Sequence, residues 1–281
     1  MSPPPHRLAD QPARDLLVVP ARYGSTRLPG KPLRAIAGRT LLERVAQVAA
    51  TAAALAGTCD MVVATDDERV ADHARALGHE VAMTAAAIES GSGRAYVAAC
   101  QRAAPPGIVV NLQGDAPFVP PALVAALLAA ARRSAAACVT PVVRLDWAAL
   151  DRLRAHKRDS PFSGTTCVRG EDGDALWFSK AILPAIRDEA GLRAADPLSP
   201  VYRHLGLYAY RLAALARFEA APPGRYERLE GLEQLRFLEL GMSVHTIAAD
   251  PPAHSMSGID TAADLALAEE LIHRHGDPHP A

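Results

Sequence analysis

Short runs of aliphatic and β-branched residues alternate with longer alanine-rich stretches along the first half of the chain. Each run has the length of a strand and ends in a polar or glycine-containing loop, and alanine-rich stretches favour helices. The pattern predicts strands at residues 16–20, 61–65, 80–83, 108–113, 138–143, 165–169, 205–210 and 244–248. It predicts helices at residues 40–56, 68–77, 91–103, 121–133, 229–240 and 261–273. Because strands and helices alternate, we expect an α/β fold with a parallel sheet covered on both faces.

Three loops rich in polar groups follow the first, second and fourth predicted strands. They read PARYGSTRLPGKP (20–32), ATDDE (64–68) and NLQGDAP (111–117). Ligands of open parallel sheets bind at the carboxyl ends of the strands. The three loops are therefore the first place to look for a binding site.

The second half of the chain is less regular. Past Arg144 the alternation weakens and aromatic residues become denser. We expect a single domain over residues 15–275, in which residues 144–227 contribute a smaller subdomain with a lid over a second substrate and a subunit interface. Residues 1–14 are expected to form a disordered extension and residues 276–281 a tail.

The composition narrows the function classes. With 281 residues and a formal net charge of -1, the chain has no overall bias toward nucleic acid or a membrane surface, so any charge that binds phosphate must be local. The first fifteen residues are polar and proline-rich, without the apolar core of a signal peptide. The longest apolar run, residues 122–131, is far shorter than the ~20 residues that cross a bilayer.

The spacing of the cysteines indicates whether the protein works in a reducing or an oxidising compartment. No two of them have the spacing of metal ligands, and each lies in or beside an apolar stretch. We expect four buried thiols in a reducing, cytoplasmic compartment. The four are Cys59, Cys100, Cys138 and Cys167.

The loop after the first strand has the composition of a polyphosphate cradle. It carries Arg22, Arg27 and Lys31, the hydroxyls of Ser25 and Thr26, and two glycines. Small residues let backbone N–H groups approach phosphate, and cations neutralise its charge. The loop is not a Walker A motif, because its glycines are one residue too far apart and a proline stands where Ser or Thr should hold magnesium. A solvated basic loop is the alternative.

The order of the motifs resembles the CMP-Kdo synthetase family, the 3-deoxy-manno-octulosonate cytidylyltransferases. Residues 20–33 are similar to the family signature, and RHLGLYAYR (203–211) is the other most specific segment. The likeness runs from about residue 16 to residue 272. Further similar segments are VATD (63–66), AMT (82–84), ESGSGR (89–94), NLQGDAP (111–117), ALWFSK (175–180), LEQLR (232–236) and GIDT (258–261).

The resemblance implies both a fold and a reaction. The fold would be a three-layer αβα nucleotidyltransferase, Rossmann-like and glycosyltransferase-A-like, with a mostly parallel mixed sheet and a smaller sugar-binding and dimerisation subdomain. In the reaction, CTP and the acidic 2-keto sugar Kdo would give CMP-Kdo and diphosphate for lipopolysaccharide or capsule synthesis. The family uses Mg²⁺ and forms homodimers.

Two aspartates are the implied metal ligands. Asp115 follows an apolar strand at a glycine turn, where a carboxylate can bridge a metal to a phosphate. Asp260, in GIDT, is the second ligand by resemblance. Without the resemblance, Asp260 is more typical of a helix N-cap, with Asp264 in the first turn.

The implied nucleotide site centres on the cradle. Arg22, Ser25, Arg27 and Lys31 would hold the phosphates. Lys31, Arg22 and Asp115 would carry the catalysis. The other implied nucleotide-binding residues are Ala21, Thr65, Asp66, Ser90, Gly91 and Gln113.

The implied sugar site draws on several segments. Arg94, His204 and Lys180 resemble the family's cations for the sugar carboxylate. The implied partners of the sugar hydroxyls are Gln113, Tyr208, Glu233 and Gln234. Taken alone, His204 could be a satisfied core histidine, and Glu233 could lie on a solvated helix face with Arg236 three residues on as its partner.

Three departures from the family concern the sugar pocket. Position 116 is Ala where the family has Glu, position 93 is Gly where it has an acidic residue, and Thr166 replaces a usual lysine. Because the changes at positions 93 and 116 remove possible carboxylate partners for an ammonium, we expect Kdo to be preferred over an amino sugar. The alternatives are another 2-keto acid sugar (amino-Kdo, a neuraminate or a pseudaminate) and a non-catalytic CTP- or CMP-sugar-binding protein.

Overall fold

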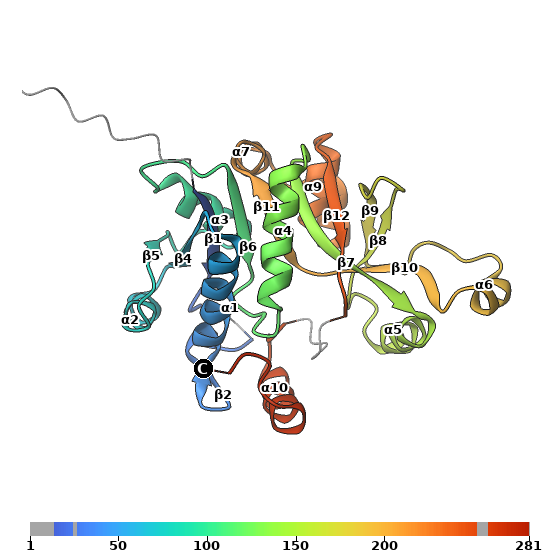
Figure 1. Cartoon of the computed structure of the whole chain (residues 1–281), viewed down its shortest axis with the longest axis horizontal. Helices are drawn as coiled ribbons and strands as arrows, with labels where there is room; N and C mark the ends of the chain where they lie inside the picture. The colour runs from blue at the N-terminus through green and yellow to red at the C-terminus, as the bar shows by residue number, and fades with distance from the viewer. Residues whose placement is uncertain (1–13, 25–26, 252–257, 281) are drawn as a thin grey trace, which may run out of the picture.

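A ten-stranded sheet runs through the chain in the computed structural model, which describes residues 14–24, 27–251 and 258–280. The strand order is β5-β4-β1-β6-β11-β7-β10-β8-β9, with β12 paired to β7 (Figure 1). Strands β9, β10 and β11 run opposite to the others, so the sheet is mixed and mostly parallel, as predicted. The strands are β1 Asp15–Pro20, β4 Cys59–Thr65, β5 Val81–Met83, β6 Ile108–Leu112, β7 Cys138–Asp146, β8 Thr166–Arg169, β9 Ala175–Ser179, β10 Leu198–His204, β11 Leu207–Arg211 and β12 Val244–Ala248.

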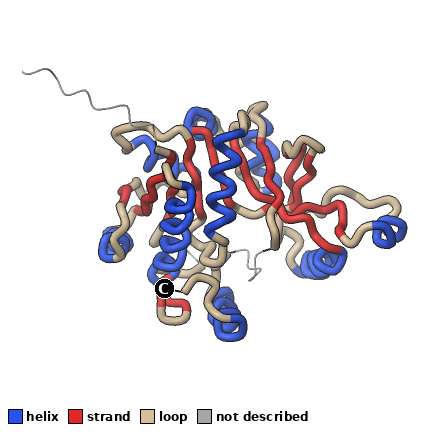
Figure 2. The backbone as a smooth tube through the Cα atoms, in the orientation of Figure 1, coloured by secondary structure: helices blue, strands red, loops and turns tan. Residues whose placement is uncertain are grey.

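Helices cover both faces of this sheet (Figure 2). Helices α1, α2, α4 and α10 contribute to the core on one face, and α3, α7 and α9 contribute to the core on the other. The helices are η1 Lys31–Leu33 (a 3-10 turn), α1 Leu41–Ala56, α2 Glu68–Ala76, α3 Gly91–Cys100, α4 Pro121–Arg133, α5 Trp147–Asp159, α6 Glu189–Ala195, α7 Leu212–Ala220, α8 Arg225–Glu230, α9 Gln234–Glu239 and α10 Ala262–His275. A short hairpin, β2 Ala35–Ile36 and β3 Arg39–Thr40, precedes α1.

The central strand β1 explains the three layers. Its side chains alternate, so Leu17 and Val19 pack in the core with α1 and α4, and Leu16 and Val18 pack in the core with α3 and α7. Strand β1 pairs in parallel with β4 on one side and β6 on the other. The three loops predicted to bind ligands therefore leave the same edge of the sheet.

The second half is more regular than predicted. The predicted helix at 229–240 is two helices, α8 and α9, because Gly231 adopts a left-handed conformation with φ 64°. Helices α5, α6 and α7 and strands β9 and β10 have no counterpart among the predicted elements. A weak sequence signal explains part of this difference, since α5 buries only Trp147 and Leu150 and α6 buries no side chain.

A third, smaller core joins α5 to β7 and β10. Its buried side chains are Val143, Leu145, Trp147, Leu150 and Val201. Because β10 and β8 continue the main sheet, this part of the chain is an extension of the domain.

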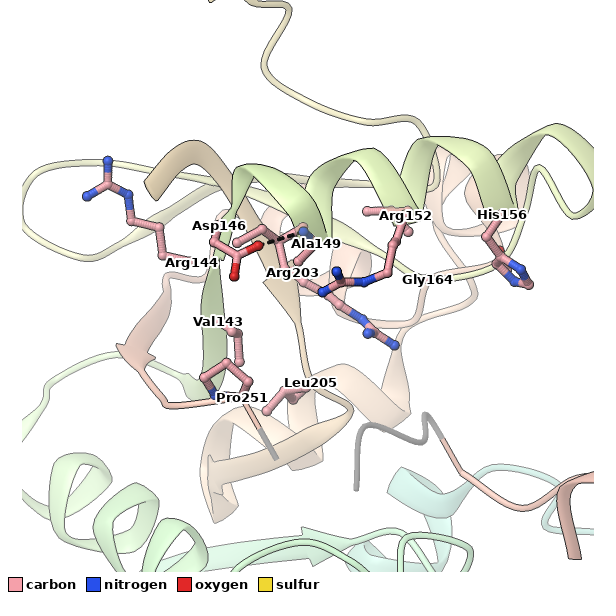
Figure 3. Close-up of a pocket in the computed structure, with 13 residues that line it drawn as sticks. Val143, Arg144, Asp146, Ala149, Arg152, His156, Gly164, Arg203, Leu205 and Pro251 are labelled. Carbon is pink, nitrogen blue, oxygen red and sulfur yellow. Dashed lines mark hydrogen bonds between the residues drawn. The ribbon is translucent and has the colours of Figure 1, made fainter. Parts of the chain in front are cut away.

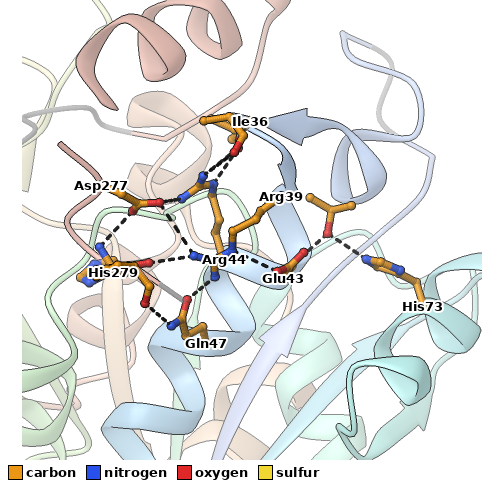
Figure 4. Close-up of polar contacts among 11 residues, drawn as sticks. Ile36, Arg39, Glu43, Arg44, Gln47, His73, Asp277 and His279 are labelled. Atoms are coloured by element: carbon orange, nitrogen blue, oxygen red, sulfur yellow. Dashed lines mark hydrogen bonds and ion pairs between the residues drawn. The ribbon is translucent and has the colours of Figure 1, made fainter. Parts of the chain in front are cut away.

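The C-terminal tail is held against α1 (Figure 4). The buried guanidinium of Arg44 pairs with Asp277 at 2.7 Å and donates two hydrogen bonds to the carbonyl of Ile36. Arg39 donates to the carbonyl of His279 at 2.8 Å, and Gln47 donates to that of Pro280 at 2.8 Å. Residues 277–280 are thus bonded to the domain.

The cysteine prediction needs one correction. Cys59, Cys138 and Cys167 are buried, but Cys100 is exposed at the end of α3. All four are free thiols. In the parts of the chain that the structure describes, every helix is too short or too polar to cross a lipid bilayer.

Candidate active site

The predicted cradle folds back on itself after β1. Gly30 has φ 67°, and a Cβ at this position would lie 3.2 Å from the hydroxyl of Tyr23, so glycine fits both the backbone and the space. The next residue, Lys31, begins the 3-10 turn, with Pro32 in its first turn. This geometry places Lys31 over the carboxyl edge of the sheet. Ser25 and Thr26, also predicted here, lie outside the described residues.

Lys31 joins the two predicted metal ligands. Its ammonium donates to Asp115 Oδ2 and to Asp260 Oδ1, each at 2.9 Å. The loops that carry the two aspartates are also joined by a backbone hydrogen bond from Ile259 to the Asp115 carbonyl, at 2.9 Å. Arg27 pairs with the other oxygen of Asp260 at 3.1 Å. Two carboxylates and two cations therefore meet at one point.

Asp260 is not the N-cap of α10. That position belongs to Thr261, whose hydroxyl accepts from the Asp264 backbone, while the Asp264 carboxylate accepts from the backbone of Thr261 and completes a capping box. The capping interpretation of Asp260 is wrong, and its carboxylate is directed to Lys31 and Arg27.

A cavity of about 210 Å³ surrounds this cluster. It brings together many of the predicted residues, including the exposed Arg22, for which the described residues provide no ion-pair partner. The predicted residues that line it are Ala21, Arg22, Arg27, Lys31, Gly91, Arg94, Gln113, Asp115 and Asp260. Pro20, Pro32, Glu89 and Gly114 complete the lining.

Two glycines let the loops approach closely. A Cβ at Gly114 would collide with the carbonyl of Pro20, so the loop after β6 crosses the end of β1 backbone to backbone. A Cβ at Gly91 would lie 3.1 Å from the amide oxygen of Gln113. Gly91 opens α3, whose N-cap is Ser90. Ser90 thus shapes the start of the helix and does not line the cavity.

The guanidinium of Arg94 is buried and already paired. It forms an ion pair with Asp66 at 3.0 Å and donates to the hydroxyl of Thr84. Arg94 Nε and Asp66 Oδ1 are buried without a hydrogen-bond partner in the described part of the chain. Asp66 therefore neutralises the charge of Arg94, which the sequence assigned to a sugar carboxylate. Arg94 Nε and Asp66 Oδ1 remain available to a ligand. The predicted Thr65 is fully buried, and its hydroxyl accepts from the Asp67 backbone.

His204 is buried and hydrogen-bonded. Its Nε2 lies 2.8 Å from the hydroxyl of Thr140, and the rings of Phe178 and Tyr208 flank it. Burial, followed by the nearby charge of Lys180, lowers the pKa of His204 to about 3. These contacts favour the alternative of a satisfied core histidine over a cation for the sugar.

Glu233 lies at the start of α9 and faces α3. Its carboxylate accepts from the hydroxyl of Ser92 at 3.0 Å, and although the residue as a whole is exposed, burial of the carboxyl group raises its pKa. Arg236, its expected partner on a solvated helix face, pairs with Glu227. The expected pairing of Glu233 with Arg236 is therefore wrong, although the residue is exposed.

Gln234 and Lys180 extend this polar region. Tyr208 donates to Gln234 Oε1 at 3.2 Å, and Gln234 Nε2 is buried without a partner among the described residues. Lys180 donates to the hydroxyl of Thr165 at 3.3 Å, and burial lowers its pKa. None of the predicted residues on β10, β11 and α9 lines the cavity around Lys31.

A second cavity, of about 490 Å³, lies between α5, β7 and β10 (Figure 3). It contains Arg144, Arg152, His156 and Arg203, and none of the predicted site residues. Arg203 precedes His204 on β10, so its side chain projects from the opposite face of the strand.

Sequence reasoning did not name two residues that shape the site, Gly114 and Thr84. Gly114 carries a signal, because glycine directly before a predicted metal ligand suggests a close approach. The role of Thr84 depends on a contact with Arg94, which has no local sequence signal.

The comparisons with known proteins agree on one family. A sequence model of the cytidylyltransferase family matches residues 16–244. The 3-deoxy-manno-octulosonate cytidylyltransferase of Maricaulis maris is 38% identical over 263 residues, which cover 93% of this chain and 98% of that protein. The enzyme of the same name from Xylella fastidiosa is 42% identical over 265 residues, covering 92% and 98%.

Two solved structures share the fold. That of CMP:2-keto-3-deoxy-manno-octonic acid synthetase complexed with CTP has a TM-score of 0.77 at 33% identity, covering 93% of this chain and 99% of the other. The 4-diphosphocytidyl-2C-methyl-D-erythritol synthase of Anaerococcus prevotii has a TM-score of 0.58 at 13% identity, which supports the fold alone.

Proposed function

The chain belongs to the cytidylyltransferase family, and from this premise we propose that it is an enzyme that transfers the cytidylyl group of CTP to 3-deoxy-manno-octulosonate. The observation that carries the proposal is the cluster of Lys31, Arg27, Asp115 and Asp260 at the carboxyl edge of the sheet. Relatives of that printed name match over almost their whole length, and the fold neighbour of similar name was solved with CTP.

The reaction needs positioning and charge neutralisation. The anomeric oxygen of the sugar attacks the α-phosphorus, the bond from that phosphorus to the bridging oxygen breaks, diphosphate leaves, and the anomeric hydroxyl loses its proton. No covalent enzyme intermediate is required, so cations placed against the phosphates supply most of what the protein contributes. Arg22, Arg27 and Lys31 line the cavity from one loop and would bind the triphosphate.

The donor set fits Mg²⁺. Asp115 and Asp260 converge on one cation, the ammonium of Lys31, and oxygen ligands are those that Mg²⁺ prefers. Within the described ranges no group of three or more His, Cys, Asp or Glu side chains could hold a metal, so phosphate oxygens and water would complete the coordination. When bound, the ion would neutralise charge on the phosphates as a Lewis acid.

Binding of the ion would change the role of Lys31. Asp115 and Asp260 would hold a divalent ion through carboxylate oxygens that now accept from the Lys31 ammonium. Lys31 and Arg27 would then pair with phosphate in place of the carboxylates. The ion pairs seen here would thus hold the cations at the site until nucleotide and metal arrive.

The other substrate would meet the residues on β11 and α9. Gln234 Nε2 and Arg94 Nε are buried donors without a described partner, as a hydroxyl- or carboxylate-binding pocket requires. Arg94 lines the cavity around Lys31, and Glu233 lies next to Gln234 and is bonded to α3. The sugar site would therefore adjoin the nucleotide site across the start of α3.

The cellular setting follows from the chemistry. CTP is a cytoplasmic metabolite, and four free thiols fit a reducing compartment, so we place the enzyme in the cytoplasm. The product would supply lipopolysaccharide or capsule synthesis. We also propose a homodimer formed by the region of β8, β9 and β10, on which Leu176 and Leu198 are exposed.

The test is diphosphate release from CTP with Kdo, 8-amino-Kdo and N-acetylneuraminate, with and without Mg²⁺. We expect release with Kdo that stops when the metal is chelated. A preference of more than about tenfold in kcat/KM for the amino sugar would overturn the choice of Kdo. CTP binding without turnover of any keto sugar would favour a non-catalytic binding protein.

A further inference from the structure

Lys180 differs from the other two cations predicted for the sugar carboxylate. Arg94 pairs with Asp66 at 3.0 Å, and His204 has the contacts of a core histidine. The half-buried Lys180 donates to a neutral group, the hydroxyl of Thr165, at 3.3 Å, and the described ranges give its ammonium no ion pair. An ammonium has three donors, so Lys180 retains donors and an unneutralised charge for an anionic ligand.

The ammonium of Lys180 lies beside β10. The hydroxyl of Thr165 accepts from Lys180, and the carbonyl of Thr165 accepts from the backbone N–H of His204 at 2.9 Å. The ring of His204 lies against that of Tyr208, whose hydroxyl donates to Gln234. A continuous series of contacts therefore leads from Lys180 to the residues predicted to bind the sugar hydroxyls.

Two side chains of opposite charge hold the backbone of Lys180. Its N–H donates to Glu230 Oε2 at 2.7 Å, and its carbonyl accepts from the ammonium of Lys157 at 2.6 Å. Each charge matches the group that it meets, because a carboxylate accepts and an ammonium donates. Hydrogen bonds with an ionised partner are stronger than neutral ones. The peptide groups on both sides of the Lys180 Cα are therefore fixed.

Glu230 ends α8 and uses both carboxylate oxygens on this segment. Its Oε1 accepts from the hydroxyl of Ser179 at 2.8 Å, and that hydroxyl accepts from the backbone of Ala181 at 2.9 Å. The hydroxyl of Thr166, one of the three departures from the family, donates to the carbonyl of Ala181 at 2.7 Å. Residues 179–181 are thus bonded to the surrounding chain one by one.

Lys157 reaches the same segment from α5. Besides the carbonyl of Lys180, its ammonium donates to the carbonyls of Pro161, Ser163 and Gly164. These acceptors use all the donors of an ammonium, so none remains for a substrate. Lys157 can therefore act on a substrate only through the groups that it holds.

We propose that Lys157 and Glu230 are positioning residues of the sugar site: they fix the backbone of Lys180, so that its ammonium meets the carboxylate of the keto sugar. The proposal rests on the proposed function, since it assumes that Lys180 binds that carboxylate. Neither Lys157 nor Glu230 touches the sugar. Because both act through Lys180, they become dispensable for sugar binding once the Lys180 charge is gone.

Mutant cycles through Lys180 test the proposal. The variants are Lys157→Met, Glu230→Ala, Lys180→Met and the two double variants that combine Lys180→Met with each of the others. We expect each single change to raise KM for Kdo about tenfold, with KM for CTP within about twofold. In the Lys180→Met background, the second change should alter KM for Kdo less than about twofold, because the charge that it positions is absent.

Two further variants separate positioning from stability. Glu230→Gln can still accept from the Lys180 N–H and hydrogen-bond Ser179, so it should keep KM for Kdo near the wild-type value. Arg158→Met is the matched control on α5, since it removes an exposed cation for which the described residues provide no partner, and it should leave both KM values unchanged. If Lys157→Met fails to fold, the Glu230 cycle decides alone.

Multiplicative effects in the double variants would show that Lys157 and Glu230 act independently of Lys180, and would overturn the proposal. Equal increases in KM for Kdo and for CTP would overturn it as well, because they would indicate a general loss of structure. Either result with a wild type that turns over Kdo leaves the proposed function intact. A wild type inactive on every keto sugar would overturn both.

Discussion

Lys31 holds together two carboxylates that would otherwise repel each other. Its ammonium is 2.9 Å from both Asp115 and Asp260 and is largely shielded from solvent. In the proposed reaction the same charge meets phosphate. The ammonium of Lys31 thus neutralises carboxylate charge in this structure and would neutralise phosphate charge in the reaction.

The first prediction concerns this charge. Lys31→Met should keep the fold and lower kcat/KM for CTP about 30- to 1,000-fold, because a charge-assisted contact to a developing phosphate charge is lost. Steady-state diphosphate release measures this change in kcat/KM. Arg34→Met is the matched control, since Arg34 is an exposed cation of the same loop whose described bond goes to a backbone carbonyl. Normal turnover in the Lys31 variant would refute the phosphate-binding role.

The second prediction separates Asp260 from its neighbour. Asp260→Asn should abolish most activity with little change in Tm, because its carboxylate faces Lys31 and caps no helix. Thr261→Ala should lower the free energy of unfolding by about 1 kcal/mol, because it removes the cap of α10. Activity in excess Mg²⁺ and thermal melting of both variants check this. The reverse result, with Asp260→Asn unstable but active, would mean that Asp260 has a structural role only.

At this scale the sequence predicts what lies on the loops after strands. Lys31, Asp115 and Asp260 meet in the structure because each follows or precedes an element with a clear pattern. His204 had the same kind of support, but burial among aromatic rings lowers its pKa and favours the core-histidine alternative.

At the scale of elements, helix α1 links the active-site loop to the C-terminal tail. It begins directly after the hairpin that follows η1, and its buried Arg44 pairs with Asp277 of the tail. The sequence suggested only a tail at residues 276–281. Polar bonds to backbone carbonyls hold this segment, and hydrophobic patterns do not report such bonds.

The third prediction tests this clamp. Asp277→Ala should lower the free energy of unfolding by about 1–3 kcal/mol at pH 7, because Arg44 stays buried with one partner fewer. Glu270→Ala, which removes an exposed ion pair with Arg274, should cost under about 1 kcal/mol. Denaturant unfolding measures both values, and equal effects would mean that the Arg44 pair adds nothing beyond a surface contact.

The stabilisation by the Arg44–Asp277 ion pair should depend on pH. Burial would raise the pKa of Asp277, but the hydrogen bonds from Arg44 and the His279 backbone together bring it below the ordinary value. A carboxyl whose folded pKa is depressed stabilises the fold above its unfolded pKa of about 3.9 and loses that contribution as the pH falls further. The difference between wild type and Asp277→Ala should therefore shrink below about pH 4.

Helices and strands in the two halves differed in how well the sequence predicted them. Strands β1, β4 and β6 are buried on both faces, so each is a continuous apolar run bounded by polar loops. Helix α5 packs a single edge against β7 and β10, and most of its remaining positions are charged. A helix with so narrow an apolar edge gives a weak periodic signal.

At the scale of the whole molecule, the sheet has two edge strands. They are β5, which contacts α2, and β9. Two large apolar side chains on the strands of the β9 end are exposed, Leu176 on β9 and Leu198 on β10. Exposed apolar groups beside an open edge strand are typical of an interface.

The last prediction is that this end of the sheet joins two copies of the chain. Sedimentation equilibrium at micromolar concentration should give the mass of a dimer. Leu176, 62% exposed on β9, would be buried in it, and burial of a leucine contributes about 1.5–3 kcal/mol. Leu176→Asp should weaken association at least about tenfold, because a carboxylate would then be desolvated in the interface. Leu55→Asp is the control, since Leu55 is 61% exposed on α1, outside this region. A monomeric wild type would show that no such dimer forms. Equal dissociation of the two variants would show that the contact lies elsewhere on the chain.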